Sequence, residues 1–167
     1  MVRNLWAPWR LEYILGKKQP GCIFCPEYHG QSDEERLILY RGGLVMVMMN
    51  KFPYNNGHLL VGPWRHISTL DELTADEERD LMDWVKRSTR VLKKVICPDG
   101  FNIGLNIGRE AGAGYAEHLH FHIVPRWRGD TNFMAFLDEV RSIPEHIKQS
   151  YSRLSPHFRK ESADEAV

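Results

Sequence analysis

The pattern that most constrains this chain is an alternation of histidine with large apolar side chains. The histidines are His118, His120 and His122, and the apolar residues beside them are Leu119, Phe121 and Ile123. Alternation with a period of two is typical of a half-buried β-strand, whose successive side chains point to opposite faces of a sheet. We therefore expect one strand over residues 118–124, with the three imidazoles on one face and the apolar side chains against a core.

The row of three imidazoles indicates a function. Polar rings contribute little to stability when they are buried, and each then needs a hydrogen-bond partner. Near neutral pH, imidazole suits proton transfer, nucleophilic attack and metal binding. The alternative is a solvated face that happens to be rich in histidine. We favour a reactive site, because lysine, threonine or glutamate would serve a solvated face equally well.

A glycine-rich segment, residues 108–114, follows a second predicted strand at residues 101–107. Glycine tolerates positive φ and close approach, so the backbone N–H groups of such a turn can face an anion. A plain hairpin turn is the alternative. Next to the histidine strand, the segment predicts a phosphate site beside a nucleophile.

Residues 118–124 resemble the signature of the histidine-triad (HIT) superfamily of nucleotide hydrolases and transferases. Two further segments carry the resemblance: Cys22-Ile23-Phe24-Cys25 is similar to its N-terminal C-x-x-C, and residues 49–61 are similar to its N-x-x-P…G-H block. The flanks at residues 5–10 and 125–130 resemble a bacterial branch related to diadenosine tetraphosphate phosphorylases. The likeness spans roughly residues 20–130, most of the chain.

The resemblance implies roles for the residues around the triad. His120, at the centre of the polar face, would attack the α-phosphorus of a nucleotide and form a nucleotidyl-histidine intermediate, since a neutral imidazole adds no charge repulsion. His122 would donate a hydrogen bond to an α-phosphate oxygen or to the leaving oxygen. Asn106 and the backbone N–H groups near Ala113 and Gly114 would hold non-bridging oxygens. For Asn106, an ordinary turn residue is the alternative.

The nucleoside pocket follows from the resemblance as well. Asn50 would bind the ribose hydroxyls, and Met48, Phe52 and Tyr54 would flank the base, because aromatic and thioether groups stack well on bases. The alternative for Met48 and Phe52 is a place in the hydrophobic core. His58 would support the triad as an additional hydrogen-bond donor.

A zinc site is expected at the cysteine pair. The spacing of Cys22 and Cys25 lets two thiolates reach one ion. The resemblance adds His66 and His118, which gives a closed Cys₂His₂ structural site that ties the N-terminal arm to the triad strand. Two alternatives stay open: a redox pair, although no strand–motif–helix context surrounds it, or free thiols without metal. Cys97 ends an apolar helical pattern and is expected in the core.

One segment departs from the family pattern. Many HIT hydrolases carry Gly-Gln-Ser/Thr just before the triad, but residues 112–117 lack that glutamine and hydroxyl and are one residue longer. The departure favours the phosphorylase-like branch, in which phosphate rather than water accepts the nucleotidyl group. The third histidine argues against a hexose-1-phosphate uridylyltransferase, which usually has glutamine there.

Composition limits the partners and the location. The chain has 22 basic and 22 acidic residues, a net charge of zero, which argues against general attraction to nucleic acid or membranes. No apolar run approaches the ~20 residues of a membrane span, and the first residues lack an apolar signal segment. With three cysteines there is no disulfide scaffold. We expect a cytoplasmic protein with a nucleotide or dinucleoside polyphosphate as its partner.

The patterns predict an α+β fold. Strands are expected at residues 37–40, 44–49, 58–61, 101–107 and 118–124. A capping box at Thr74 opens a long helix, and a helical pattern runs from Phe133 with a break at Pro144. We expect an N-terminal arm at residues 1–20, one domain at 21–159 and a disordered tail at 160–167. The resemblance implies a HIT-like five-stranded antiparallel sheet with one long and one C-terminal helix, in a homodimer with a continuous sheet.

Several functions fit these features. The first is an enzyme that cleaves dinucleoside polyphosphates such as diadenosine tetraphosphate at the α-phosphate, by phosphorolysis or hydrolysis. The alternatives are a nucleoside phosphoramidate or nucleotide-conjugate hydrolase, a nucleotide-binding module with slow turnover, and a zinc-stabilised interaction domain. The intact triad favours the enzyme.

Overall fold

The computed structural model describes residues 21–25, 32–112, 114–130 and 145–163. The predicted arm at residues 1–20 and the helical pattern at 133–144 lie outside the described residues. The elements, in chain order, are α2 (Asp33–Arg36), β1 (Ile38–Arg41), β2 (Val45–Met49), β3 (Leu59–Pro63), the 3-10 helix η1 (Leu70–Glu72), α3 (Ala75–Ile96), β4 (Gly100–Leu105), the 3-10 helix η2 (Arg109–Ala111), β5 (Phe121–Arg126) and α5 (Ile147–Ala163).

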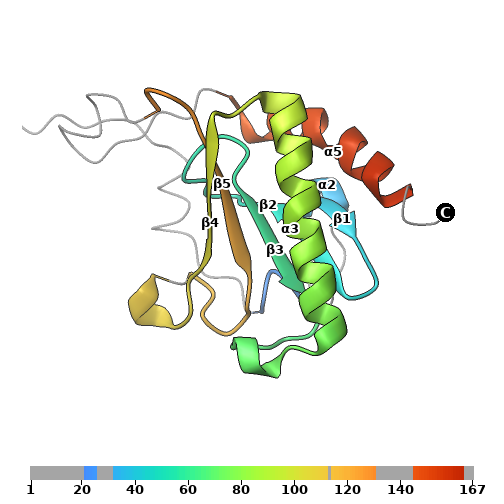
Figure 1. The fold of residues 1–167 in the computed structure, drawn as a ribbon, viewed down its shortest axis with the longest axis vertical. Coiled ribbons are helices and arrows are strands. Elements are labelled where there is room, and N and C mark those ends of the chain that lie inside the picture. Colours follow the sequence, from blue (N-terminus) through green and yellow to red (C-terminus); the bar gives the residue numbers. More distant parts are fainter. Residues whose placement is uncertain (1–20, 26–31, 113, 131–144, 164–167) are drawn as a thin grey trace, which may run out of the picture.

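The five strands form one antiparallel sheet in the order β1-β2-β3-β5-β4 (Figure 1). This confirms the predicted five-stranded antiparallel sheet. Strand β5, the last strand among the described residues, lies between β3 and β4 and therefore has a hydrogen-bonded neighbour on each side. The strand that carries the end of the triad is thus an interior strand held in register by two partners.

Helices α3 and α5 cover one face of the sheet, and together they enclose the main core (Figure 1). Trp84 and Leu92 of α3 and Leu154 and Phe158 of α5 are fully buried against strand residues such as Val47. Helix α3 begins where the capping box predicts. The Thr74 hydroxyl accepts a hydrogen bond from the Glu77 N–H, and the Glu77 carboxylate accepts one from the Thr74 N–H.

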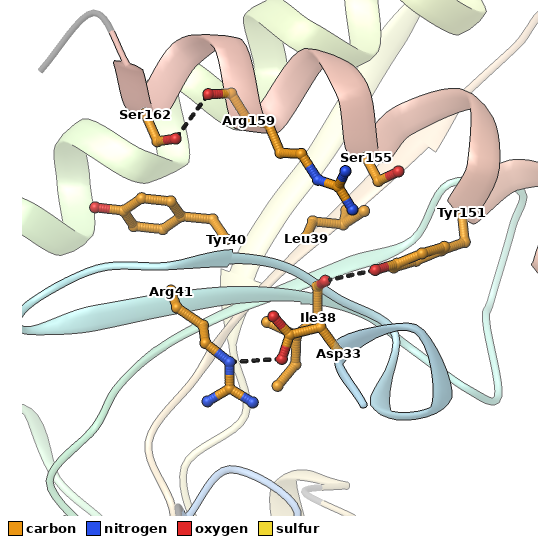
Figure 2. A pocket seen from close by; sticks show the side chains of 9 residues that line it. All are labelled: Asp33, Ile38, Leu39, Tyr40, Arg41, Tyr151, Ser155, Arg159 and Ser162. Atoms are coloured by element: carbon orange, nitrogen blue, oxygen red, sulfur yellow. Dashed lines mark hydrogen bonds and ion pairs between the residues drawn. The ribbon is translucent and has the colours of Figure 1, made fainter. Parts of the chain in front are cut away.

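The edge strand β1 is joined to α5 by polar contacts around a small pocket of about 150 Å³ (Figure 2). The Tyr151 hydroxyl donates to the Ile38 carbonyl at 3.1 Å, and Arg41 forms an ion pair with Asp33. Strands β2 and β3 separate this pocket from the triad strand. The bond of Tyr151 attaches α5 to the sheet, whereas the Arg41–Asp33 pair joins β1 to α2.

The C-terminal tail differs from the prediction. Residues 160–163 form the last turn of α5 rather than a disordered tail, while residues 164–167 lie outside the described residues. Contacts with α3 explain the difference: Arg87 donates to the Glu161 carbonyl at 3.0 Å, and Arg90 pairs with the Glu161 carboxylate at 3.4 Å. A local pattern cannot show such cross-helix contacts.

Cys97 also differs from the prediction, because it is exposed rather than part of the core. It is the C-cap of α3 and adopts a left-handed conformation, with φ of 47°. Its carbonyl accepts a hydrogen bond from the Trp127 indole at 3.1 Å. The end of the helix, not the apolar pattern that leads to it, determines where this side chain points.

Over the described residues, none of the helices combines the length and the apolar character needed to cross a membrane.

Candidate active site and metal site

The triad segment is only partly a strand. Strand β5 begins at Phe121, so His122 is the one triad histidine inside it, and the prediction of a strand over 118–124 is wrong at its start. His118 and His120 precede the ladder, where the Leu119 N–H donates to the Ile67 carbonyl at 2.6 Å. Because this contact lies outside the regular strand ladder, the rings of His118 and His120 can belong to different sites.

His122 lies beside an open cleft of about 280 Å³. Its cross-strand neighbours are Leu60 and Gly104, which places its side chain on the face of the sheet that α3 does not cover. At Gly104 an added side chain would meet nothing within 4 Å, so the space next to His122 is open. Asn106 and Tyr54 line the same cleft, which brings together two residues predicted to contact phosphate, His122 and Asn106.

A chain of hydrogen bonds determines the tautomer of His122. Nδ1 of His58 accepts from the Tyr54 N–H at 3.1 Å and from the Asn50 carboxamide at 3.3 Å, so the proton of His58 is on Nε2. That Nε2–H donates to Nδ1 of His122 at 2.9 Å. His122 therefore carries its own proton on Nε2, a buried atom with no partner among the described residues. This donor is available to a ligand.

His120 has the opposite tautomer. Its Nδ1–H donates to the His118 carbonyl at 2.7 Å, which leaves the lone pair on Nε2. The ring is 6% exposed, and its centroid is 4.8 Å from that of His122. A nucleophilic nitrogen and a proton donor thus lie side by side.

Burial keeps these imidazoles neutral. Burial, followed by the neighbouring His122 and His120, lowers the pKa of His58 to about 3. Burial, followed by the charge of His120, lowers the pKa of His122 to about 4. Burial also lowers the pKa of His120, although its hydrogen bond to the His118 carbonyl opposes the shift. At neutral pH His120 retains its lone pair, as a nucleophile requires.

The residues predicted for the nucleoside have mixed surroundings. The Asn50 carboxamide oxygen accepts from the Phe52 N–H at 2.9 Å, so this side chain shapes the loop that carries Phe52. Phe52 is half-buried, whereas Met48 is 5% exposed in a second core cluster with Met46 and Leu60. For Met48 these contacts match the core alternative.

The glycine-rich segment contains two glycines in a conformation that other residues rarely adopt. Gly108 and Gly112 flank η2 and both have φ of 85°, which confirms the need for glycine. Gly114 is exposed, with open space where a side chain would begin. Ala113 lies outside the described residues.

The predicted metal ligands lie together. Cys22, Cys25, His66 and His118 each offer one ligand atom, and these four atoms lie within 4.8 Å of one another. The Nδ1 of His118 lies 3.3 Å from the sulfur of Cys22 and 3.3 Å from Nδ1 of His66. The sulfur of Cys25 lies 3.1 Å from Nδ1 of His66. This set of four could hold a metal ion.

The spacing of the set fits a small tetrahedral ion. Metal–sulfur bonds of ~2.3 Å and metal–nitrogen bonds of ~2.05 Å place neighbouring ligand atoms about 3.3–3.8 Å apart. The nearest pairs in the cluster are separated by 3.1–3.8 Å. His118 is also oriented for coordination, because its Nε2–H donates to the Pro63 carbonyl at 2.9 Å and leaves the lone pair of Nδ1 directed at the cluster.

Three residues at the site make contacts that the sequence analysis did not predict. Arg36 is buried and donates to the carbonyls of Ile23 at 2.8 Å and Cys25 at 3.3 Å, which holds the C-x-x-C loop. Tyr54, expected only near the base, lies with its ring centroid 5.8 Å from that of His122. Phe24 stacks on two triad histidines. The one local signal in the sequence for these contacts of Phe24 is its position between Cys22 and Cys25.

This sheet and triad define a class of protein, and the comparisons agree with it. The HIT domain model matches residues 31–129, and the chain belongs to the HIT family. A Mycobacterium tuberculosis protein named AP-4-A phosphorylase is 39% identical over 168 residues, which cover 96% of this chain and 86% of that one. A Schizosaccharomyces pombe asymmetrical bis(5'-nucleosyl)-tetraphosphatase is 37% identical over 93 residues, 56% of this chain and 50% of that one.

Solved structures share the fold. The histidine triad nucleotide-binding protein ST2152 from Sulfolobus tokodaii strain7, described as hypothetical, matches with a TM-score of 0.60 at 30% identity. The match covers 77% of this chain and 84% of that chain.

Proposed function

We propose that this protein cleaves dinucleoside polyphosphates at the α-phosphate through a nucleotidyl intermediate on His120. The observation that carries the proposal is the pair of adjacent imidazoles with opposite tautomers. His120 has a lone pair on Nε2, and His122 has an unpartnered proton on Nε2 beside the cleft. A nucleophile next to a proton donor is the arrangement that displacement at phosphorus needs.

The first step forms a bond between Nε2 of His120 and the α-phosphorus. The bond from that phosphorus to the bridging oxygen breaks, and diadenosine tetraphosphate releases ATP. The Nε2–H of His122 donates to the leaving or a non-bridging oxygen, where negative charge develops. In the second step an acceptor oxygen attacks the same phosphorus and the nitrogen–phosphorus bond breaks. Phosphate as the acceptor gives ADP, and water gives AMP.

Phosphate is the acceptor that we favour. The relative named AP-4-A phosphorylase aligns over nearly the whole chain, whereas the relative named as a tetraphosphatase aligns over about half of it. The segment at residues 112–117 also lacks the glutamine and hydroxyl typical of HIT hydrolases. Hydrolysis is the second candidate, and it uses the same intermediate.

The remaining contacts are assigned by position and resemblance. We propose that Asn106 and the backbone N–H groups near Ala113 and Gly114 hold the non-bridging oxygens, since Asn106 lines the cleft with His122. Asn50 would bind the ribose hydroxyls, with Phe52 near the base. His58 would orient His122 through the bond at 2.9 Å.

Product analysis tests the function. The protein is incubated with diadenosine tetraphosphate with and without inorganic phosphate, and nucleotides are separated by anion exchange. We expect ADP plus ATP only with phosphate; AMP plus ATP without phosphate would establish the hydrolase instead. His120→Ala should reduce turnover at least ~10³-fold, whereas His157→Ala on α5 should not. Unchanged turnover by His120→Ala would exclude the covalent intermediate.

We further propose that Cys22, Cys25, His66 and His118 bind Zn²⁺. Two thiolates and two imidazoles are ligands that zinc prefers, and four of the six distances between the ligand atoms are 3.1–3.8 Å. All four positions would come from the protein, so the ion would have a structural role and would connect the C-x-x-C loop to the triad segment.

Metal analysis tests the zinc proposal. Protein prepared without chelators should contain one zinc per chain. Cys25→Ser should lose most of it and melt at a lower temperature. Cys97→Ser is the matched control, because this cysteine is exposed at the end of α3 and should leave the metal content unchanged. Equal zinc in both variants would refute the assignment.

We infer that the protein is a homodimer joined along β4. This strand pairs with β5 alone among the described strands, and Ile103 on it is 46% exposed. An edge strand with an exposed apolar side chain is suited to pairing with a second copy, which would extend the sheet. Light scattering should give the dimer mass, and Ile103→Lys should shift it towards the monomer.

We also infer a cytoplasmic location. The proposed zinc site needs the thiols of Cys22 and Cys25 in the reduced form, which is the form that binds metal. Thiols persist in reducing compartments. Cell fractionation with an antibody to the protein tests this inference, and recovery in an oxidising compartment would contradict it.

A further inference from the structure

Phe24 connects the metal site to the nucleophile. It lies between Cys22 and Cys25 and is fully buried. Its ring stacks on that of His118 at a centroid distance of 4.7 Å and an interplanar angle of 21°. It also contacts the ring of His120 at 4.7 Å and 31°. One aromatic side chain therefore touches a ligand of the Cys/His cluster and the proposed nucleophile.

Gly62 of β3 packs against the other side of residues 119–120. A Cβ added at Gly62 would lie 2.9 Å from the carbonyl oxygen of Leu119, closer than real contacts allow. It would also lie 3.4 Å from Cβ of His120 and 3.7 Å from Cδ1 of Phe24. The backbone at residues 119–120 is thus packed tightly between β3 and Phe24, with little freedom to shift.

Hydrogen bonds join the nucleophile to the cluster through the backbone as well. The His120 Nδ1–H donates to the carbonyl of His118, whose ring is in the cluster. Arg36 holds the carbonyls on either side of Phe24, those of Ile23 and Cys25. A change in the C-x-x-C loop would therefore move Phe24 and the segment on which His120 is oriented.

We propose that Phe24 is a positioning residue, which fixes the orientation of His120 according to the state of the Cys/His cluster. Loss of metal then slows nucleotidyl transfer to His120 without weakening nucleotide binding. The described residues that line the cleft, Asn106 among them, include none from the C-x-x-C loop. This inference rests on the proposed function, because it concerns the same nucleophile.

The first test compares two buried phenylalanines. Phe24→Leu removes the ring at the site, and Phe158→Leu removes an equally buried ring from the main core under α3 and α5. We expect Phe24→Leu to lower kcat ~10–100-fold with KM within about twofold, since a small misplacement of reacting groups is costly. Phe158→Leu should lower the melting temperature and keep kcat.

Two results would overturn the proposal. If Phe24→Leu and Phe158→Leu have the same kcat, the role of Phe24 is structural only. If KM rises while kcat is unchanged, Phe24 acts through nucleotide binding.

A second pair of variants approaches His120 from the opposite side. Gly62→Ala should displace residues 119–120 and lower kcat, with metal content unchanged. Gly43→Ala is the control, because its added Cβ meets nothing within 4 Å. Equal kcat in the two variants would contradict the packing argument. This pair also decides the matter if Phe24→Leu does not fold.

Nuclear magnetic resonance of the wild-type protein gives a readout independent of turnover. The hydrogen-bonded Nδ1–H of His120 should give a resolved proton signal that is absent in His120→Ala. Metal removal with a chelator should shift or remove that signal, and an unchanged signal would refute the coupling. If the protein cleaves no dinucleoside polyphosphate, the proposed function fails, yet this signal still reports whether the cluster positions His120.

Discussion

His120 and His122 have the same side chain but opposite tautomers, because their Nδ1 atoms have different partners. Nδ1 of His120 faces a carbonyl and must carry the proton, whereas Nδ1 of His122 faces the Nε2–H of His58 and must not. Each ring therefore presents a different Nε2, one with a lone pair and one with a proton. The tautomer of each of these histidines is therefore determined by the hydrogen bond at its Nδ1.

His58 should accordingly affect the rate of the reaction without touching the substrate. His58→Phe keeps a ring of similar size but removes the donor to His122, whose tautomer is then no longer fixed. We expect kcat to fall ~10–100-fold, as for a misdirected general acid. Steady-state kinetics with His157→Phe as the control measure this effect. An unchanged kcat would show that the tautomer of His122 does not depend on His58.

At the scale of elements, the start of α3 is more than a helix cap. The Glu77 carboxylate closes the capping box with Thr74 and also binds Arg65 through both of its oxygens, each at 2.7 Å. Its side chain is 4% exposed, and the bond from Arg65 is the main reason that its pKa is lowered to about 2. Arg65 precedes His66 of the Cys/His cluster in the chain, so the cap ties α3 to the loop that carries His66.

Two capping glutamates allow a matched comparison of this effect. Glu35 closes the capping box of α2 with Ser32, but it is exposed. Glu77→Ala should lower the free energy of unfolding by about 2 kcal/mol, since a buried cap and a charge-assisted pair are both lost. Glu35→Ala should have a much smaller effect. Urea denaturation measures both, and equal losses would show that the bond to Arg65 contributes nothing.

On the scale of the whole molecule, the site exists because the sheet gathers distant segments. Strand β5 is placed between β3 and β4, which puts His122 beside the loop before β3 and the segment after β4. The second face of the sheet therefore carries the cleft, while α3 and α5 cover the first. The same burial that builds this face keeps the imidazoles neutral.

Folding stability should therefore depend on pH in a predictable direction. In the folded protein the pKa values of His58 and His122 are about 3 and 4, against 6.5 for a free histidine. As the pH falls below 6.5, these two histidines bind protons in the unfolded chain but remain neutral in the folded protein. The stabilisation is thus complete above pH 6.5 and declines down to about pH 4 for His122 and about pH 3 for His58.

Urea denaturation at pH 7.5 and 5.0 checks this sign. The groups that face the pair are His120 and Tyr54. The wild-type protein should lose about 1–2 kcal/mol more than His58→Phe over this interval, because the variant lacks one of the two shifted groups. The comparison removes the effect of the Cys/His cluster, which both proteins share. A steeper loss in the variant would contradict the assignment.

The sequence by itself determined the local features. Periodicity placed the five strands to within a few residues, the Thr74 capping box placed the start of α3, and residue spacing paired Cys22 with Cys25. The resemblance to the family added His66 and His118, which lie in the same cluster. Such signals depend on neighbours in the chain, so they can be read without a fold.

Only the tertiary structure decided which ring nitrogen of each histidine carries the proton. The His58–His122 bond joins residues 64 positions apart, and the contact of Phe24 with His120 spans most of the domain. Strand β5 begins only at Phe121, after His118 and His120, and the Leu119 N–H bonds to the Ile67 carbonyl, a contact with a distant loop. A period-two pattern fixes the face on which a side chain lies, but hydrogen-bond partners and tautomers come from long-range packing.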